Sequence, residues 1–481
     1  MKARWLDRAV GVVVAVVITL AAVLLWLTVA WSNPEAAEPP TEGILLGVWE
    51  LFYVTSAPSE RVLLAAVSLA LLAAGIIALL ERRATDTARR SSNVLRTPLA
   101  ARAIMEQTRG RYDGPVTVTV LIPAHNEQAT IPATLTSLLS QSHPPDRIIV
   151  VADNCTDATV SLARQHGVEV FESRANVHKK AGALNQALRE LLPHQGNNDV
   201  VMVMDADTTL DDGFLATAVN AFTQDRALMA VGGLFYGEEG GGILGQLQRN
   251  EYIRYSREIR RRRGRVFILT GTASIFRPVA LRAVAENRGV SLPGTNGNVY
   301  DTAALTEDNE LTIALKSLGA LMISPQQCTV VTEVMPTLGT LWRQRLRWER
   351  GALENIGAYG VRPQTIRYWA QQLGLGYSVF AFALFLLLMG LTMLAVDTWI
   401  WFPFWLGLGA VFVIERVVTV WRGGWRARAL AVAFVPELLF DMLLNVIYVK
   451  GIIDITLGRQ AAWSHVDRSA GDGDRQEARH A

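Results

Sequence analysis

Two aspartates one residue apart, Asp205 and Asp207, directly follow an apolar segment at residues 200–204. This segment has the length and composition of a buried β-strand. Carboxylates at the end of a strand offer the hard oxygen ligands that Mg²⁺ or Mn²⁺ prefers, and the bound ion typically bridges to substrate phosphates. A solvated turn after a strand would use the same residues. The pair alone therefore leaves a metal site and a plain turn equally open.

Polar residues also follow two other predicted strands. His125 and Glu127 come after the strand at 116–122, and Asp153 comes after the strand at 147–151. Polar residues in such positions are common in turns and at helix N-termini, so either group alone has a structural explanation. The carboxyl ends of parallel strands lie along one edge of a sheet, where ligands bind. Polar clusters at three strand ends therefore favour one shared ligand site.

A further acidic group begins a predicted helix that runs to about Leu318. Thr306 suits the N-cap of this helix, and Glu307 and Asp308 in its first turn suit the positive end of the helix dipole. The functional alternative is that one of these carboxylates lies near the metal site and acts as a general base on an acceptor hydroxyl. Judged alone, the segment fits the structural explanation better.

Gln344, Arg347 and Trp348 share one face of a predicted amphipathic helix, because they are spaced at i, i+3 and i+4. Arginine binds phosphate well, and the tryptophan ring is a flat apolar surface on which a sugar ring can stack. The same residue types anchor helices at a membrane surface. Ligand binding and interfacial anchoring are both open for this motif.

The strands that position these residues alternate with amphipathic helices between residues 116 and 204. This alternation predicts an α/β domain with a parallel sheet and helices on both faces. No G-x-G-x-x-G motif follows the first strand, and the glycine-rich stretch 232–245 lacks the Lys-Ser/Thr of a phosphate loop. A dinucleotide-binding domain and an NTPase of that kind are therefore not expected.

The chain as a whole is apolar. Of its 481 residues 50% are hydrophobic and 19% are charged, whereas a soluble domain carries about 25% charged residues. A bilayer core is spanned by about 20 apolar residues. Five candidate spans occur, at residues 9–31, 61–80, 368–396, 399–421 and 429–457. Carboxylates interrupt the last of them, and we expect these to face a protein interior rather than lipid.

The distribution of charge predicts the topology. The loop 32–60 has no Lys or Arg, whereas five arginines follow the second span between residues 82 and 96. The positive-inside rule therefore predicts a multi-pass protein of the plasma (inner) membrane with its large domain in the cytoplasm. The net charge of +2 does not indicate nucleic-acid binding, and two cysteines exclude a disulfide scaffold. The expected parts are two transmembrane helices with a short extracellular loop (1–83), a cytoplasmic catalytic domain (84–335), an amphipathic interface helix (336–364), about three transmembrane helices (365–460) and a polar disordered tail (461–481).

Taken together, these motifs resemble those of the membrane-embedded, processive family 2 glycosyltransferases, which include cellulose, chitin, hyaluronan and poly-N-acetylglucosamine synthases. The resemblance covers nearly the whole chain, and the order of its motifs is specific where any one of them is not. The context Gln-x-x-Arg-Trp-Glu-Arg-Gly is most similar to the bacterial poly-β-1,6-N-acetylglucosamine synthases. The motifs that carry the resemblance are Asp153, Asp205-Ala206-Asp207, Thr306-Glu307-Asp308 and Gln344-x-x-Arg347-Trp348.

The resemblance implies a GT-A fold, which is a Rossmann-like domain for nucleotide sugars, and a UDP-sugar donor. It implies that Asp308 is the catalytic base and that Asp205 and Asp207 hold Mg²⁺ or Mn²⁺ on the donor diphosphate. By the same implication the donor is bound by Pro123, His125, Glu127, Asp153, Lys180, Asp205, Gln344 and Arg347. The acceptor is bound by Thr272, Ala273, Glu307 and Trp348.

The expected function is that of an inverting, metal-dependent transferase that extends a β-linked polysaccharide and moves it across the membrane. UDP-N-acetylglucosamine is the first expected donor and UDP-glucose the second. The expected partners are this donor, the growing polysaccharide and membrane lipid. Two alternatives stay open: a non-processive enzyme that adds one sugar to a lipid, and a transporter or receptor with a catalytically silent domain.

Overall fold

The computed structural model describes residues 16, 18–27, 30, 41–45, 49–53, 59–90, 97–108, 114–261, 264–395 and 403–459. The expected tail (461–481) and most of the expected extracellular loop (32–60) lie outside these residues. The chain divides into two compact units, of which one comprises residues 1–91 with 374–414 and the other residues 92–373 with 415–481.

The first unit contains an antiparallel hairpin and long helices. The hairpin pairs β1 (Thr41–Leu45) with β2 (Trp49–Tyr53). Helix α2 (Glu60–Arg90) includes the predicted span 61–80 and continues for ten residues beyond it. The unit also contains a short apolar helix (Ile18–Leu27), the C-terminal part of α12 (Ile366–Ala395) and most of α13 (Pro403–Thr419).

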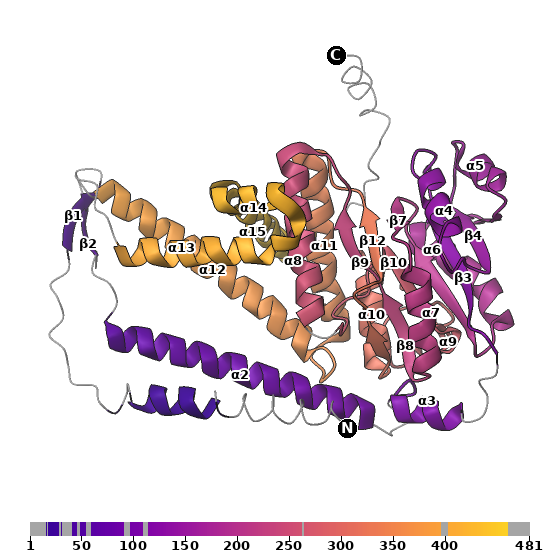
Figure 1. Ribbon diagram of the computed structural model, residues 1–481, viewed down its shortest axis with the longest axis horizontal. Helices are drawn as coiled ribbons and strands as arrows, with labels where there is room; N and C mark the ends of the chain where they lie inside the picture. The colour runs from indigo at the N-terminus through magenta and orange to yellow at the C-terminus, as the bar shows by residue number, and fades with distance from the viewer. Residues whose placement is uncertain are drawn as a thin grey trace, which may run out of the picture. The chain divides into compact units, whose positions relative to one another are not determined.

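The second unit is built on a seven-stranded sheet with the order β11-β8-β10-β6-β3-β4-β5 (Figure 1). Its first four strands in the sequence are parallel, as predicted, and are β3 (Thr117–Ala124), β4 (Arg147–Ala152), β5 (Glu169–Glu172) and β6 (Asp199–Met204). The sheet is completed by β8 (Leu228–Gly232), β10 (Ala273–Phe276) and β11 (Leu321–Ile323). Strand β10 runs antiparallel to both of its neighbours, so the sheet is mixed rather than all-parallel.

A second, three-stranded sheet and a set of helices surround this main sheet. The small sheet has the order β7-β12-β9, with β7 (Thr208–Leu210), β12 (Thr329–Thr332) and β9 (Leu234–Gly237). The helices before the motif helix are α3 (Ala101–Gln107), α4 (Ile131–Leu139), α5 (Thr159–Gln165), α6 (Lys179–Leu191), α7 (Phe214–Gln224), α8 (Gly242–Arg261), α9 (Pro278–Asn287) and α10 (Glu307–Ser317). The predicted amphipathic helix at 336–364 is α11 (Leu338–Tyr359), which starts with a capping box at Thr337.

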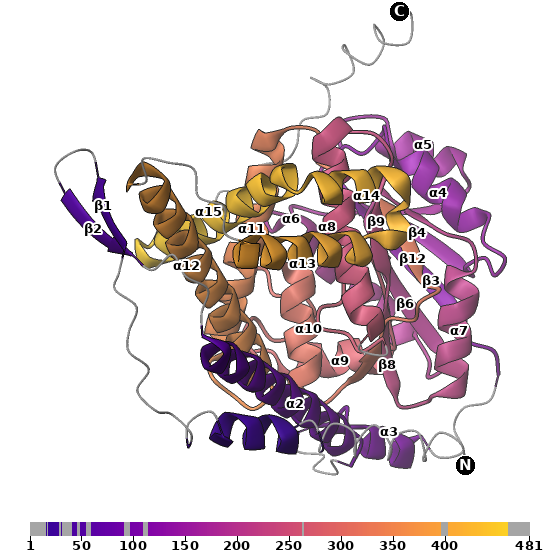
Figure 2. The same ribbon diagram turned by 60° about the vertical axis from the view of Figure 1, so that its left-hand side comes forward.

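The main sheet is buried on both faces. Along β6, Val201 and Val203 pack into one apolar cluster with α6, α9, α10 and α11, and Val200 and Met202 pack into another with α4, α5 and α7. Alternating residues of a strand point to opposite faces, so a strand covered on both sides must be apolar throughout. The segment 200–204 meets this requirement, and its end is held at the edge of the sheet where the acidic residues follow. Figure 2 shows the ribbon of Figure 1 turned by 60°.

By length and composition, one described helical segment, Ile366–Leu391, is able to cross a membrane on its own. The predicted span 429–457 is not one continuous helix. A short helical segment and α14 (Gly424–Ala433) meet α15 (Val435–Thr456) at an angle of 82°. Phe434 lies at the break with φ 56° and ψ −52°, and Pro436 then starts the new helix. Proline has no N–H to donate to a preceding turn, so it is tolerated at a helix start and not inside a helix.

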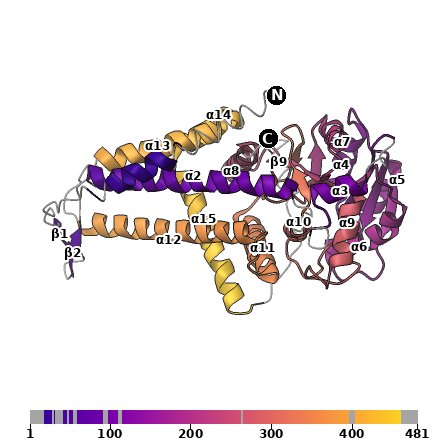
Figure 3. The ribbon, with the colours of Figure 1, turned by 90° about the horizontal axis from the view of Figure 1, so that it is seen from below.

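Two carboxylates of this last segment, Glu437 and Asp454, are buried as predicted, whereas the Asp441 side chain is 34% exposed. Glu437 is only 1% exposed and accepts hydrogen bonds from Asn250 (2.8 Å) and Arg254 (2.6 Å) of α8. Arg416 lies 3.4 Å from the same carboxylate. Helix α15 also packs against α11, and both helices can be followed in Figure 3. These contacts explain why the residues after 414 belong to the same compact unit as the sheet.

Candidate active site

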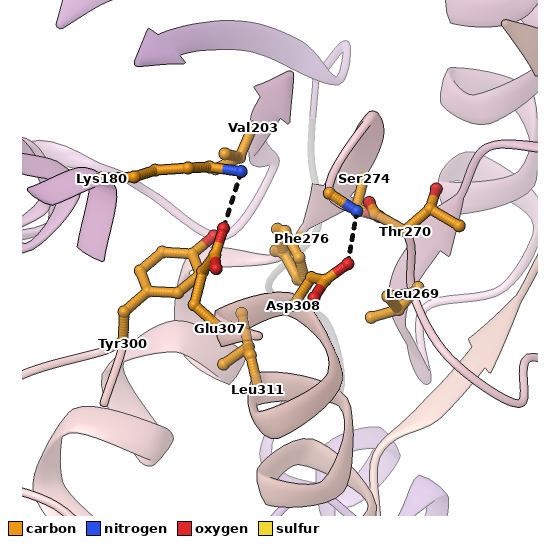
Figure 4. A pocket seen from close by; sticks show the side chains of 11 residues that line it. Lys180, Val203, Leu269, Thr270, Ser274, Phe276, Tyr300, Glu307, Asp308 and Leu311 are labelled. Atoms are coloured by element: carbon orange, nitrogen blue, oxygen red, sulfur yellow. Dashed lines mark hydrogen bonds and ion pairs between the residues drawn. The ribbon is translucent and has the colours of Figure 1, made fainter. Parts of the chain in front are cut away.

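Three side chains predicted from separate motifs meet at the carboxyl end of β6. Lys180, in the first turn of α6, places its Nζ 2.6 Å from Asp205 Oδ1 and 2.8 Å from Glu307 Oε1. Asp205 directly follows β6, and Glu307 begins α10. The lysine therefore bridges the carboxylate expected on the donor side to one expected on the acceptor side. Figure 4 shows the contact between Lys180 and Glu307 among the residues that line the pocket.

Asp308 is the next residue of α10 and lines the same pocket. Its Oδ2 accepts a hydrogen bond from the backbone N–H of Gly271 at 2.9 Å, and its Oδ1 accepts one from the N–H of Asn309 at 2.7 Å. Figure 4 marks this bond with the dashed line that ends at Asp308. These two donors fix the orientation of the carboxylate.

Gly271 marks the point where the charged groups converge. A Cβ built on this glycine would lie 3.3 Å from Lys180 Nζ, 3.4 Å from Asp308 Oδ2 and 3.5 Å from Asp205 Oδ2. A reacting atom placed there would therefore lie within reach of all three groups. Gly271 directly precedes Thr272 and Ala273, which the resemblance assigns to the acceptor site.

The same crowding perturbs the ionisation of the carboxyl groups. Burial raises the pKa of Asp205 to about 6; the charges of Asp207 and Glu307 act in the same direction, whereas Lys180 opposes it. Burial, together with the charge of Glu307, likewise raises the pKa of Asp308 to about 6. Burial also acts to raise the pKa of Glu307, but Lys180 outweighs it and holds that pKa below its usual value. A carboxylate whose pKa lies near the operating pH is well suited to act as a general base.

The residues predicted at the first two strand ends also come together. His125 Nδ1 lies 2.5 Å from the backbone oxygen of Asp153, and Asp153 is itself buried. Asp153 Oδ1 accepts hydrogen bonds from Ser173 (2.7 Å) and Asn176 (2.8 Å). Glu127 is also buried and accepts a hydrogen bond from Thr130 at 3.0 Å. Pro123 is a buried residue of β3, one position before its end.

Asn176 links this cluster to the pocket and was missed in the sequence. Its Nδ2 donates to Asp153 and also to the backbone oxygen of Lys179 at 2.7 Å, while its Oδ1 accepts from the N–H of His178. The asparagine thus fixes the start of α6, which carries Lys180. A polar residue that bonds to nearby backbone just before a helix is the signal that could have indicated it. Tyr300 also lines the pocket, and its position in a loop gave no such signal.

Thr272 and Ala273, around the start of β10, were both expected to bind the acceptor. The structure places these two residues differently. Ala273 is fully buried in the core, paired with Met204 of β6, and is absent from the pocket lining. Its neighbour Ser274 points to the other face and lines the pocket, because alternate residues of a strand face opposite sides. Thr272 donates from Oγ1 to Thr270 Oγ1 at 2.9 Å, and its backbone oxygen accepts from the N–H of Asp205. Gly271 and Ser274 therefore line the pocket, whereas Ala273 does not.

Helix α11, which carries Gln344, Arg347 and Trp348, is tied to the start of α10. Asn355 Nδ2 donates to the backbone oxygen of Thr306 at 3.0 Å and to its Oγ1 at 3.1 Å. The charge of Arg347 acts to lower the pKa of Glu307. Gln344 Oε1 is buried and has no hydrogen-bond partner among the described residues.

The donor atoms suit a divalent metal only in part. Among the described residues no group of three or more His, Cys, Asp or Glu side chains is arranged to hold a metal ion. Asp205 and Asp207 nevertheless lie together, and the charge of Asp207 helps to raise the pKa of Asp205. A cation would relieve this repulsion. The two carboxylates fit a metal that takes its remaining ligands from a bound diphosphate and water.

A comparison with protein families decides the class of this domain. Residues 119–284 match the model of glycosyl transferase family 2. The chain carries a family 2 glycosyltransferase domain. This confirms the resemblance drawn from the motifs, and the family match supports the GT-A assignment of the α/β domain. Asp205 and Lys180 lie inside the matched residues, whereas Asp308 and the α11 motif lie beyond them.

Two curated relatives that match this chain carry the same protein name. The poly-beta-1,6-N-acetyl-D-glucosamine synthases of Staphylococcus epidermidis and Staphylococcus aureus (strain COL) are 28% and 29% identical to this chain over 244 residues. Each match covers 49% of this chain and 55% of the relative. The chain thus spans about half the length of the curated relatives it matches.

Solved structures give more distant likenesses. The mannosyltransferase PcManGT from Pyrobaculum calidifontis, in complex with GDP-Man and Mn²⁺, has a TM-score of 0.47 at 18% identity, covering 82% of this chain and 99% of that one. The glucosyl-3-phosphoglycerate synthase from Mycobacterium tuberculosis, with Mn²⁺, UDP and phosphoglyceric acid, has a TM-score of 0.34 at 18% identity, covering 55% of this chain and 83% of that one.

Proposed function

We propose that this protein is a membrane-bound, inverting, metal-dependent glycosyltransferase that extends a β-linked polysaccharide from a UDP-sugar. The observation that carries the proposal is the convergence of Asp205, Asp308 and Lys180 on one point beside Gly271. UDP-N-acetylglucosamine is the first proposed donor and UDP-glucose the second. The names of the curated relatives favour the first.

Inversion at the anomeric carbon needs one base and a neutralised leaving group. In the proposed reaction an acceptor hydroxyl attacks the anomeric carbon and its proton passes to Asp308. The bond from that carbon to the diphosphate oxygen breaks, and UDP leaves with the bonding electrons. The hydrogen bonds from Gly271 and Asn309 hold the Asp308 carboxylate in place for this transfer.

Charge on the departing UDP is balanced by cationic groups. Arg347, whose charge acts on Glu307, is suited to contact the diphosphate. Mg²⁺ or Mn²⁺ held by Asp205 and Asp207 would supply further neutralisation of the leaving group. Asp153, held by Ser173 and Asn176, is proposed to bind the uridine together with the segment from Pro123 to Glu127.

The terminal sugar of the growing polysaccharide is proposed to bind at α11. Trp348 supplies a ring on which the terminal sugar stacks. Gln344 Oε1 is buried and has no hydrogen-bond partner among the described residues, so it is able to accept a hydrogen bond from a sugar hydroxyl. Helix α12 follows α11 and contains the segment Ile366–Leu391 that is long and apolar enough to span a bilayer. A plasma-membrane location would allow the product to leave through the membrane as it grows.

The test is UDP release by the purified protein in nanodiscs with Mg²⁺ or Mn²⁺. UDP-N-acetylglucosamine and UDP-glucose are supplied separately, and product length is measured beside UDP release. Asp308→Asn should abolish release, whereas Asp212→Asn, at an exposed carboxylate near the start of α7, should not. Long product with one donor supports the proposal. A single sugar on lipid would refute processivity, and full release by Asp308→Asn would refute the assigned base.

A further inference from the structure

Arg345 lies inside the Gln344-to-Trp348 segment at a position to which no role has been assigned. Its side chain is 4% exposed, although it carries a full charge. Nη2 lies 2.7 Å from Glu251 Oε2 of α8, and the guanidinium carbon lies 4.2 Å from the centre of the Trp348 ring. The arginine therefore joins a carboxylate on one helix to the indole of another.

Packing alone explains this arrangement poorly. Burying a guanidinium costs solvation energy, and an apolar side chain of similar volume usually fills such a space at lower cost. The Arg345 Nε is buried and has no hydrogen-bond partner among the described residues, which adds to the cost. A guanidinium in this position is useful only if its orientation, or its contact with the Trp348 ring, contributes to function.

The contact with the ring restricts how Trp348 is oriented. A guanidinium is planar and lies flat on an aromatic face, where the ring's electrons attract it. Glu251 fixes the other end of Arg345, so the plane of the guanidinium is set from α8. The backbone of α11 is already tied to the catalytic helix α10 through Asn355 and Thr306. The two constraints together set both the place and the tilt of the indole relative to Asp308.

We infer that the Glu251–Arg345 ion pair is a positioning device that orients the Trp348 ring for stacking of the acceptor sugar. The inference rests on the proposed function, because it takes Trp348 as the acceptor platform. Arg345 and Glu251 act through Trp348 and touch neither donor nor reacting atoms. Loss of the pair should therefore weaken acceptor binding and leave donor binding unchanged.

The chain provides a matched control on the same helix. Arg350 of α11 pairs with Glu354 at 2.5 Å, and the Glu354 side chain is 32% exposed, against 34% for Glu251. Glu354→Gln and Glu251→Gln thus each remove a carboxylate of similar exposure that pairs with an arginine of α11. Of these two ion pairs in the described structure, only the one between Arg345 and Glu251 has an arginine that contacts Trp348.

The experiment measures KM for a short β-1,6-linked N-acetylglucosamine oligosaccharide, KM for the UDP-sugar, and product length in nanodiscs. We expect Glu251→Gln to raise the acceptor KM about 5- to 10-fold and to shorten the product, with the donor KM changed less than about two-fold. Glu354→Gln should match the wild type in all three. If Glu251→Gln also matches the wild type, the inference is overturned and the proposed function stands.

Arg345→Lys separates orientation of the ring from simple structural support. Lysine keeps the charge and is able to pair with Glu251, but it has no planar group to lie on the indole. We expect it to raise the acceptor KM as Glu251→Gln does, while the melting temperature stays near that of the wild type. Recovery of the wild-type KM by lysine would overturn the inference. A wild-type protein that releases no UDP from either donor would refute the proposed function and this inference with it.

Discussion

The backbone N–H of Gly271 donates to Asp308 Oδ2 at 2.9 Å, so the loop before β10 and the first turn of α10 are joined at the proposed base. The two residues come from segments 37 positions apart in the chain. This contact holds the carboxylate beside the end of β6, where Asp205 follows the sheet. Substitutions at and around this contact give direct tests of the site.

Gly271→Ala should inactivate the enzyme without unfolding it. The added methyl would lie 3.3 to 3.5 Å from Lys180, Asp308 and Asp205, which is close contact without backbone overlap. It would occupy the space that reacting atoms need, and a displacement of about 1 Å costs about 100-fold in rate. UDP release should fall at least about 100-fold while the melting temperature stays unchanged. A variant with wild-type release would show that substrate does not pass this point.

The rate should fall steeply as the solution is made more acidic than about pH 6. A general base works only when deprotonated, and burial raises the pKa of Asp308 to about 6. Asp205 has a similarly raised pKa and must also be ionised to hold a cation. With two such groups, log kcat/KM should fall by more than one per pH unit. The measurement is UDP release from pH 5 to 8, and a flat profile between pH 5 and 7 would contradict the assigned base.

Breaking the buried ion pair behind the base should destabilise the fold strongly. Arg288 is fully buried and contacts both carboxylate oxygens of Glu310, at 2.5 and 2.7 Å, two residues after Asp308. Arg288→Met leaves a buried charge without its partner, which costs about 3 to 5 kcal/mol. The exposed Arg147–Glu169 pair has the same two-point geometry, and Arg147→Met should cost at most about 1 kcal/mol. Denaturant unfolding of both variants tests this, and equal losses would contradict it.

Two glycines of α11 should respond oppositely to alanine. A Cβ on Gly351 would lie 2.5 Å from Thr306 Oγ1, so alanine must push α11 away from α10. A Cβ on Gly357 would meet nothing within 4 Å, and alanine there should stabilise the helix by about 0.5 to 1 kcal/mol. Gly351→Ala should therefore lower both stability and activity. Thermal melting and UDP release check this, and Thr306→Ala should partly restore the Gly351→Ala variant.

The parts of the site that follow strand ends were predictable from the sequence. Asp205 follows a strand that is apolar on both faces, and parallel strands must end at one edge, so its neighbours could be grouped in advance. The bridge from Lys180 to Glu307 was not predictable, because it depends on how two helices far apart in the chain are placed. The motif resemblance named both residues and gave no contact between them.

Two differences in the fold have local causes. The pattern of β10 does not show its direction, since a short apolar strand reads the same way in parallel and antiparallel pairing. Alternation along β10 then places Ala273 in the core and Ser274 at the pocket. The break at Phe434 was signalled by Pro436, but the surrounding hydrophobic residues suggested a continuous span. Contacts between Glu437 and α8 stabilise the broken form.

Asn250 donates a hydrogen bond to Glu437, which lies 187 residues later in the chain. At a synthesis rate of 5 to 20 residues per second, the ribosome makes that stretch in about 10 to 40 s. Throughout this interval α8 exposes an asparagine and an arginine whose partner does not yet exist. The catalytic unit therefore completes its packing only when the last helices have been translated, and a nascent chain stopped before residue 437 carries the entire sheet without its final support.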